Sequence, residues 1–154
     1  MSDKEDLVKA TMEKRVLAMD LNSSAKDCAK AMTRRGVSSA VVVQGGNALG
    51  IVTERDLVSK VLSDGLDPAK VLVRDIMSTP LITVSPEATI TKAAEVMAEY
   101  RIRRLVVIDQ AGALVGIVTA GDVARLLAEK HGYRDAAFNA MARYKEGVEE
   151  GPYQ

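Results

Sequence analysis

The chain contains an internal repeat, and this feature most restricts the folds open to it. Residues 12–44 align with residues 77–109 at an offset of 65, and after a one-residue slip the offset becomes 66. In that second frame the run Gly-Ile-Val-Thr stands at residues 50–53 and again at residues 116–119, and an aspartate follows each run at the same distance. Chance rarely places a four-residue identity in frame with the upstream matches. We therefore infer that the chain is a duplicated unit.

Each repeat has the pattern β-α-β-β-α. Short apolar stretches predict the first strands, at residues 16–19 and 81–84. Apolar residues at i, i+3, i+4 and i+7 then predict amphipathic helices, with the faces Ala25, Cys28, Ala29, Met32 and Ile90, Ala93, Ala94, Met97. Continuous Val, Ile and Leu runs predict strands buried on both faces, at residues 40–44, 49–53, 105–109 and 114–119. Second helices are expected at residues 54–62 and 121–130.

These elements indicate a mixed α/β (α+β) fold made of two tandem β-α-β-β-α units. We expect the first unit at residues 1–66, the second at residues 67–131 and a charged, partly helical tail at residues 132–154. Residues 67–77 are expected to form a short helix and linker between the halves. Residues 3–12 are expected to occupy the same place before the first repeat.

Charge and composition argue against several classes of protein. Lys plus Arg and Asp plus Glu number 21 each, whereas a nucleic-acid-binding protein usually has an excess of basic residues. No apolar run approaches the ~20 residues of a membrane span, and the charged N-terminus lacks an apolar signal region, so we expect a cytoplasmic protein without membrane contact. Cys28 and His131 are single residues of their kinds, and neither has companions for a metal site or a catalytic triad.

The two Thr-x-x-Asp motifs, Thr53 with Asp56 and Thr119 with Asp122, are the main candidates for ligand binding. A carboxylate can accept hydrogen bonds from both hydroxyls of a ribose, and a helix N-terminus suits a phosphate. The same spacing is also that of a capping box, in which Thr caps the helix and Asp bonds back to the N–H of the cap. The two roles are compatible, and the sequence leaves both open.

The duplicated unit, with each half ending in Gly-hydrophobic-hydrophobic-Thr-x-x-Asp, resembles the CBS domain family, named for cystathionine β-synthase. The resemblance covers roughly residues 8–130. It implies that the halves pack sheet to sheet with pseudo-twofold symmetry, as in a Bateman module. It also implies two clefts that take AMP, ADP, ATP, S-adenosylmethionine or a dinucleotide as regulatory ligands, no obligatory cofactor, and disc-like homodimers.

The resemblance further implies roles for residues outside the Thr-x-x-Asp motifs. Arg103 and Arg104 would bind phosphate, and the aligned positions in the first repeat are Ser38 and Ser39. An adenine slot would be lined by residues from both repeats, namely Thr79, Ile82, Val84, Ile102 and Ile117 with Lys14, Met19, Val37 and Ile51. Apolar strand residues are core residues by default, so only those at strand ends are expected to face a cleft.

We therefore expect a regulatory module that senses an adenosine-containing ligand, has no catalysis of its own and acts on an unidentified partner protein. The residues after the second repeat are too few for a catalytic domain. A nucleic-acid-binding protein and a purely structural dimerisation module remain as alternatives, the former through Arg34, Arg35, Arg101, Arg103 and Arg104. A homodimer is expected, with Val58, Val61, Val123 and Leu127 as candidates for its interface.

Overall fold

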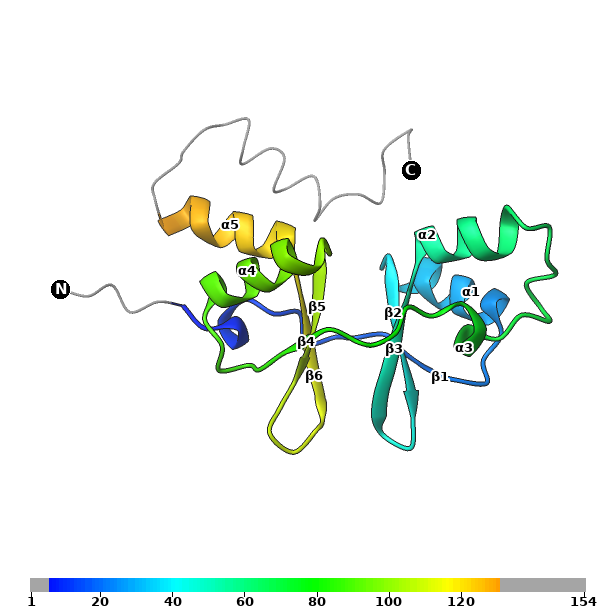
Figure 1. Ribbon diagram of the computed structural model, residues 1–154, viewed down its shortest axis with the longest axis horizontal. Helices are drawn as coiled ribbons and strands as arrows, with labels where there is room; N and C mark the ends of the chain where they lie inside the picture. Colours follow the sequence, from blue (N-terminus) through cyan, green and yellow to red (C-terminus); the bar gives the residue numbers. More distant parts are fainter. Residues whose placement is uncertain (1–5, 131–154) are drawn as a thin grey trace.

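The computed structural model describes residues 6–130, which form two similar halves (Figure 1). The first half contains β1 (Ala18–Asp20), α1 (Ala25–Arg35), β2 (Ser39–Gln44), β3 (Asn47–Thr53), α2 (Glu54–Leu57) and the π-helical turn η2 (Val58–Leu62). The second half contains β4 (Thr83–Val84), α4 (Ile90–Tyr100), β5 (Arg104–Ile108), β6 (Leu114–Thr119) and α5 (Ala120–Lys130). Two short helices, η1 (Val8–Ala10) and α3 (Val73–Ile76), precede the repeats. The predicted α+β order β-α-β-β-α is confirmed in both halves.

Each half is built on a three-stranded sheet with the order β1-β2-β3 or β4-β5-β6. The first strand pairs in parallel with the second, which pairs antiparallel with the third. The pairing register shifts at equivalent places, between Val42 and Val43 and between Val107 and Ile108. The first strand begins at Ala18, two residues later than predicted, and Leu17 joins the sheet only through its carbonyl oxygen, which accepts from the Val41 N–H at 2.8 Å.

The helix ends follow from capping residues in the sequence. Ser24 Oγ accepts from the Asp27 N–H at 3.0 Å at the start of α1, and Thr89 caps α4 in the same way. α1 ends at Gly36, whose φ of 61° is in the left-handed region that glycine reaches without strain. The predicted helix at residues 54–62 begins as α2 and continues without a break as η2.

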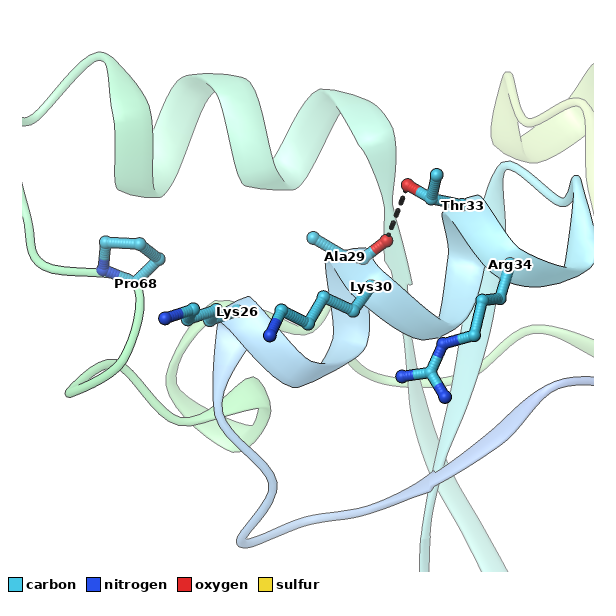
Figure 2. Close-up of a pocket in the computed structure, with 6 residues that line it drawn as sticks. All are labelled: Lys26, Ala29, Lys30, Thr33, Arg34 and Pro68. Atoms are coloured by element: carbon cyan, nitrogen blue, oxygen red, sulfur yellow. Dashed lines mark hydrogen bonds between the residues drawn. The ribbon is translucent and has the colours of Figure 1, made fainter.

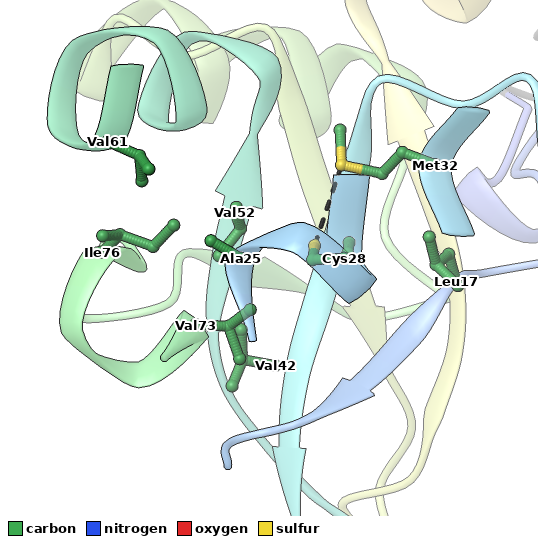
Figure 3. Close-up of a cluster of buried hydrophobic side chains, with 10 residues drawn as sticks. Leu17, Ala25, Cys28, Met32, Val42, Val52, Val61, Val73 and Ile76 are labelled. Carbon is green, nitrogen blue, oxygen red and sulfur yellow. Dashed lines mark hydrogen bonds between the residues drawn. The ribbon is translucent and has the colours of Figure 1, made fainter. Parts of the chain in front are cut away.

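The helices cover the outer face of each sheet and enclose a separate core there. Figure 3 shows the first core, where Cys28 and Met32 of α1 meet Val42 and Val52 of the sheet. Cys28 is fully buried, and this burial raises the pKa of its thiol. The predicted place of Cys28 on the apolar face of this helix is therefore confirmed.

The inner faces of the two sheets are also apolar, and they lie against each other in the middle of the molecule (Figure 1). Val42 belongs to the first helix-covered core, so its neighbour Val41 points to the opposite, inner face. Val41 and its equivalent Val106 are 0% and 1% exposed although neither belongs to a helix-covered core. The prediction of burial on both faces is confirmed for β2 and β5, whereas Ile51 of β3 and Ile117 of β6 are half-buried on the inner face.

The segments that precede the repeats cross between the halves. Val8 of η1 is buried in the second core, and Glu13 pairs with Ile117 of β6. The aligned segment, residues 73–78, packs against the first half, since Val73 of α3 is buried in the first core and Ser78 pairs with Ile51 of β3. The two segments do occupy equivalent places, as predicted. A division between residues 66 and 67 thus separates the repeats in sequence, whereas packing joins each leading segment to the other half. The predicted tail at residues 132–154 lies outside the described residues.

The residues predicted for a dimer interface divide into two classes. Val61 and Val123 are 4% and 6% exposed and belong to the two cores, so the prediction is wrong for this pair. Helical spacing identifies an apolar face but not which of two neighbouring apolar positions turns inward. Val58 and Leu127 are 56% and 42% exposed and remain available to a partner.

The crossing segments predict the effect of a methyl group at Gly50. A Cβ atom there would lie 2.8 Å from both Met77 Sδ and the Ser78 carbonyl oxygen. The Gly50→Ala variant should therefore lose about 1–3 kcal/mol of unfolding free energy in urea, because the backbone oxygen cannot move aside as a side chain can. Gly46→Ala is the control, since no atom lies within 4 Å of its Cβ position and only backbone strain is added. A loss at Gly50 no larger than this control would contradict the account.

Candidate functional site

The first candidate site lies where β3 ends and α2 begins. Asp56 Oδ2 accepts from the Thr53 N–H at 2.9 Å, and Thr53 Oγ1 accepts from the Asp56 N–H at 3.3 Å. The second oxygen, Asp56 Oδ1, lies 3.0 Å from Lys60 Nζ. The same ammonium group donates to the carbonyl oxygen of Ile76 at 2.8 Å. The carboxylate is therefore fixed between the helix start and the end of α3, and Asp56 is only 7% exposed.

The second candidate site repeats this geometry where β6 ends and α5 begins. Asp122 Oδ2 accepts from the Thr119 N–H at 2.9 Å, and Thr119 Oγ1 accepts from the Asp122 N–H at 3.2 Å. The cation partner differs, since Arg125 Nη2 lies 3.4 Å from Asp122 Oδ1 and comes from the next turn of the same helix. The position equivalent to Lys60 is Leu126, which packs against the second core.

Both Thr-x-x-Asp motifs are capping boxes, so that interpretation of the spacing is confirmed. A cap of this kind satisfies N–H groups that the helix leaves without partners. Its presence does not exclude ligand contact, because the Thr and Asp side chains are held at the ends of strands that border the interface between the sheets. The caps instead give these polar groups a fixed direction.

Arg104 brings a positive charge from the second half to the first site. Its Nη1 donates to the Ser38 carbonyl oxygen at 3.3 Å, and the same oxygen accepts from the Glu54 N–H at 3.1 Å. Burial lowers the pKa of Arg104, while the neighbouring carboxylates of Glu54 and Asp56 oppose this shift and Arg103 adds to it. An arginine stays protonated under such shifts. The guanidinium therefore lies beside the Asp56 corner, where β3 ends and α2 begins. It does not lie beside the Asp122 corner, where β6 ends and α5 begins.

Arg103 and Arg104 are thus not equivalent in space. Arg103 is exposed, and its carbonyl oxygen accepts from the Ala120 N–H at 2.8 Å at the start of α5. Ser38 occupies the matching place at the start of α2. The sequence left open which aspartate the arginines accompany, and the contacts assign Arg104 to Asp56.

The residues predicted to line an adenine slot lie in three environments. Ile51 and Ile117 are half-buried on the inner sheet faces, opposite Val41 and Val106 in the pairing register. Lys14 and Thr79 are exposed just beyond the crossing contacts. The remaining members contribute to the two helix-covered cores, namely Met19, Val37, Ile82, Ile102 and Val84, of which Val84 is buried. For all of these residues, contact with a ligand stays a prediction.

Lys60, Arg125 and Glu54 are site residues that the sequence analysis missed. Asp56 with Lys60 is an i, i+4 pair and Asp122 with Arg125 an i, i+3 pair, both of which are ordinary helical spacings for opposite charges. The spacing could have identified the ion pairs. The bond from Lys60 to Ile76 joins residues 16 positions apart and has no local signal.

A groove between the halves opens at the opposite end of the sheets, near the hairpin turns. It measures about 380 Å³ and is lined by residues of both halves, namely Asn47, Ala48, Leu49, Pro80, Leu81, Thr83, Ile108 and Gly112. Neither Thr-x-x-Asp motif lines it. Within residues 6–130, no helix is long and apolar enough to cross a membrane. The same residues contain no cluster of three or more potential metal-binding side chains.

The capping geometry predicts that the carboxylate of Asp56 stabilises the fold. Asp56→Ala should lower the free energy of unfolding by about 1–3 kcal/mol, because it removes a helix cap and a charge-assisted bond. Asp27→Ala is the matched control, since Asp27 has the same position in α1 but its carboxylate accepts no hydrogen bond from another group within residues 6–130. Urea unfolding should show a smaller loss for the control. Equal losses would mean that the carboxylate of Asp56 adds nothing to its helix.

Curated relatives resemble the chain over the region of the repeats. An uncharacterized protein of Methanopyrus kandleri is 44% identical over 65% of this chain and 52% of its own length. The CBS domain-containing protein YhcV of Bacillus subtilis is 35% identical over 76% of this chain and 82% of its own length. The chain thus spans only about half of the Methanopyrus relative.

Solved structures share the arrangement of the two halves. The CBS domain pair of protein MJ0100, in complex with 5-methylthioadenosine and S-adenosyl-L-methionine, matches with a TM-score of 0.74 and 28% identity. The match covers 82% of this chain and 98% of that one. The family model described as "CBS domain" matches twice, at residues 5–63 and 73–129. The chain belongs to the CBS domain family and carries a tandem pair of its domains.

Proposed function

We propose that the chain is a regulatory module that binds an adenosine-containing ligand between its two CBS domains and has no catalysis of its own. The observation that carries this proposal is the pair of equivalent Thr–Asp corners, Thr53 with Asp56 and Thr119 with Asp122, at the edges of the sheet interface. The adenosyl ligands of the MJ0100 domain pair support the same class of ligand here.

The chemistry of the Asp56 corner is compatible with a ribose. An ionised carboxylate has about four acceptor positions. The Thr53 N–H, the Thr53 hydroxyl and Lys60 use three of them. The hydroxyl can rotate its proton toward a ligand, which leaves two acceptor positions for the two hydroxyls of a ribose. A cap and a ribose can therefore share this side chain.

The ligand acts as a regulator in this proposal, so no cofactor is obligatory. We also propose that the protein works in the cytoplasm. AMP, ADP, ATP and S-adenosylmethionine all present the ribose and adenine that the corners require. The response depends on how differently the ligand binds two arrangements of the halves, and a partner protein would detect the change. The arginines considered for nucleic acid are divided between the halves, Arg34 and Arg35 on α1 and the others around β5, which disfavours that alternative.

The proposal predicts stabilisation by adenosyl compounds. A ligand at 100 times its Kd should add about 2.7 kcal/mol, which raises the Tm by at least about 5 °C in a thermal-shift assay. Guanine and pyrimidine nucleotides are the controls and should give smaller shifts. Mass spectrometry of small molecules released from the denatured protein would identify a ligand that co-purifies. No shift with any adenosyl compound at millimolar concentration would refute the proposal.

We also propose that the Asp56 corner takes the phosphate of a nucleotide, because Arg104 stands beside it. An arginine fork binds phosphate through paired N–H groups, and the equivalent position in the first repeat is Ser39, which carries no charge. The Asp122 corner thus lacks the corresponding arginine from the other half. Phosphorylated and unphosphorylated adenosyl ligands should therefore differ in their preference for the two corners.

Replacing Arg104 tests this assignment. Arg104→Gln should weaken AMP or ATP about tenfold or more, since a charge-assisted bond contributes about 1.5–3 kcal/mol, and should leave adenosine nearly unchanged. It should also reduce the salt dependence of nucleotide binding. Arg103→Gln is the matched control, because it removes the same charge from an exposed side chain, and the carbonyl oxygen of Arg103 borders the start of α5 and not that of α2. Titration calorimetry that finds equal AMP affinity in Arg104→Gln and wild type would reject the phosphate role.

We also propose that the chain forms a homodimer. Val58 and Leu127, two of the side chains predicted for the interface, are exposed and lie on the outer helices of different halves. Leu62 and Tyr100 on the same outer layers are 75% and 52% exposed. Large apolar side chains at such exposure on both halves favour a surface that a second copy covers.

A further inference from the structure

Lys60 ties the Asp56 corner to the segment that joins the two halves. Its ammonium group lies 3.0 Å from Asp56 Oδ1 and donates to the Ile76 carbonyl oxygen at 2.8 Å. Ile76 ends α3, and the next two residues, Met77 and Ser78, lie against β3. One side chain therefore connects the carboxylate proposed to hold a ribose with the contact between the linker and the first sheet.

Lys60 belongs to the π-helical turn η2, which differs from the matching stretch of the second half. The Ser63 N–H donates to the Val58 carbonyl oxygen, five residues earlier, at 2.8 Å. The equivalent residues of the second half lie within the regular α-helix α5. Turns of the π type are rare, and many of them lie at functional sites. The widened turn thus distinguishes the Asp56 corner from its equivalent.

The π turn exchanges the roles of two neighbouring helix positions. In the second half, Leu126 packs against the core and Leu127 is 42% exposed. In the first half the equivalent of Leu127 is Val61, which is 4% exposed and belongs to the core. A wider turn holds about one residue more, so the core position moves along by one. Lys60, which aligns with Leu126, is released from the core and reaches both the corner and the end of α3.

The Asp122 corner lacks a tie at this position. The carbonyl group equivalent to that of Ile76 belongs to Thr11, and the apolar side chain of Leu126 has no donor for it. Arg125, which pairs with Asp122, comes from the same helix as its partner. The two corners therefore differ in how they are linked to the segments that cross between the halves.

We infer that Lys60 is a positioning residue through which a ligand at the Asp56 corner restrains the linker between the halves. This inference rests on the proposed ribose contact and adds which corner is coupled to the linker. A ribose bound to Asp56 fixes the carboxylate, and the charge-assisted bonds of Lys60 then hold the end of α3 more tightly against β3. The coupling is reciprocal, so loss of the tie also weakens the ligand. A ligand at Asp122 has no such route through Leu126.

Replacing Lys60 in the full chain tests this coupling, with AMP as the probe because its phosphate is proposed to bind at the Asp56 corner. In wild type, saturating AMP should slow amide hydrogen exchange at Met77 and Ser78 about fivefold or more, since both N–H groups are bonded at the junction. In Lys60→Met, compared at equal saturation, the slowing should fall below about twofold. The Kd for AMP should rise about threefold or more. Lys60→Arg retains the charge and should recover most of the slowing.

Lys30→Met is the matched control, because it removes an exposed ammonium group from the same half without touching the tie. Its side chain lines a groove of about 440 Å³ along α1, to which neither Asp56 nor Ile76 contributes (Figure 2). The other residues that line this groove are Lys26, Ala29, Thr33, Arg34 and Pro68. The control should leave the Kd for AMP and the slowing at Met77 and Ser78 unchanged. Nuclear magnetic resonance measures the exchange rates, and titration calorimetry measures the Kd.

The outcomes separate failure of the coupling from failure of the proposed function. Slowing that persists in Lys60→Met arises from direct contact between AMP and the linker, and it overturns the inference. A wild-type chain that binds AMP without slowing at Met77 and Ser78 also overturns it. A wild-type chain that binds no adenosyl compound overturns the proposed function on which the inference rests. Circular dichroism establishes that each variant is folded, and Lys60→Gln, which keeps donors without charge, replaces Lys60→Met if the latter does not fold.

Discussion

Each sheet of this chain has two apolar faces but only one layer of helices, and the architecture follows from that imbalance. The outer face, which includes Val42 and Val107, is covered by the helices of its own half. The inner face, which includes Val41 and Val106, is covered only because the other sheet lies against it. Burial of a valine side chain stabilises a fold by about 1.5–3 kcal/mol, so neither half could leave its inner face in water without a large loss. The Thr–Asp corners lie at the edge of this interface because β3 and β6 end there.

The crossing segments make the pairing of the halves specific. Met12 and Glu13 lie against Gly116 of the second half, and Met77 and Ser78 lie against Gly50 of the first. In both places the absence of a side chain on glycine allows a backbone and a methionine sulfur to approach the strand closely. Apolar faces alone could slide over one another, whereas these backbone pairs fix the register at both edges. The positions of Asp56 and Asp122 relative to the opposite half are fixed by the same contacts.

The parts of the fold that could be predicted from sequence are those with local or repeated signals. The strand runs, the helix faces and both capping boxes follow from the spacing of a few residues, and the repeat supplied each of them twice. The crossing of residues 6–13 and 73–78 could not be predicted, because pairing of Glu13 with Ile117 joins segments more than 100 positions apart. The association of Arg104 with Asp56 rather than Asp122 depends on that tertiary arrangement. The side chains of Val61 and Val123 point inward because of how their helices pack against the sheets. The periodicity of a helix sequence does not describe that packing.

The two halves agree where packing constrains them and differ where solvent or a ligand does. The inner-face residues are the same in both repeats, valine at 41 and 106 and isoleucine at 51 and 117, because each pair must fill the same space against the other sheet. At the corners, Lys60 ties Asp56 to the Ile76 carbonyl, while the equivalent Leu126 packs into a core and Arg125 pairs with Asp122 instead. A change of charge at such partly exposed positions has little effect on the packing energy of the fold. The scaffold can therefore stay symmetric while its two corners acquire different chemistry.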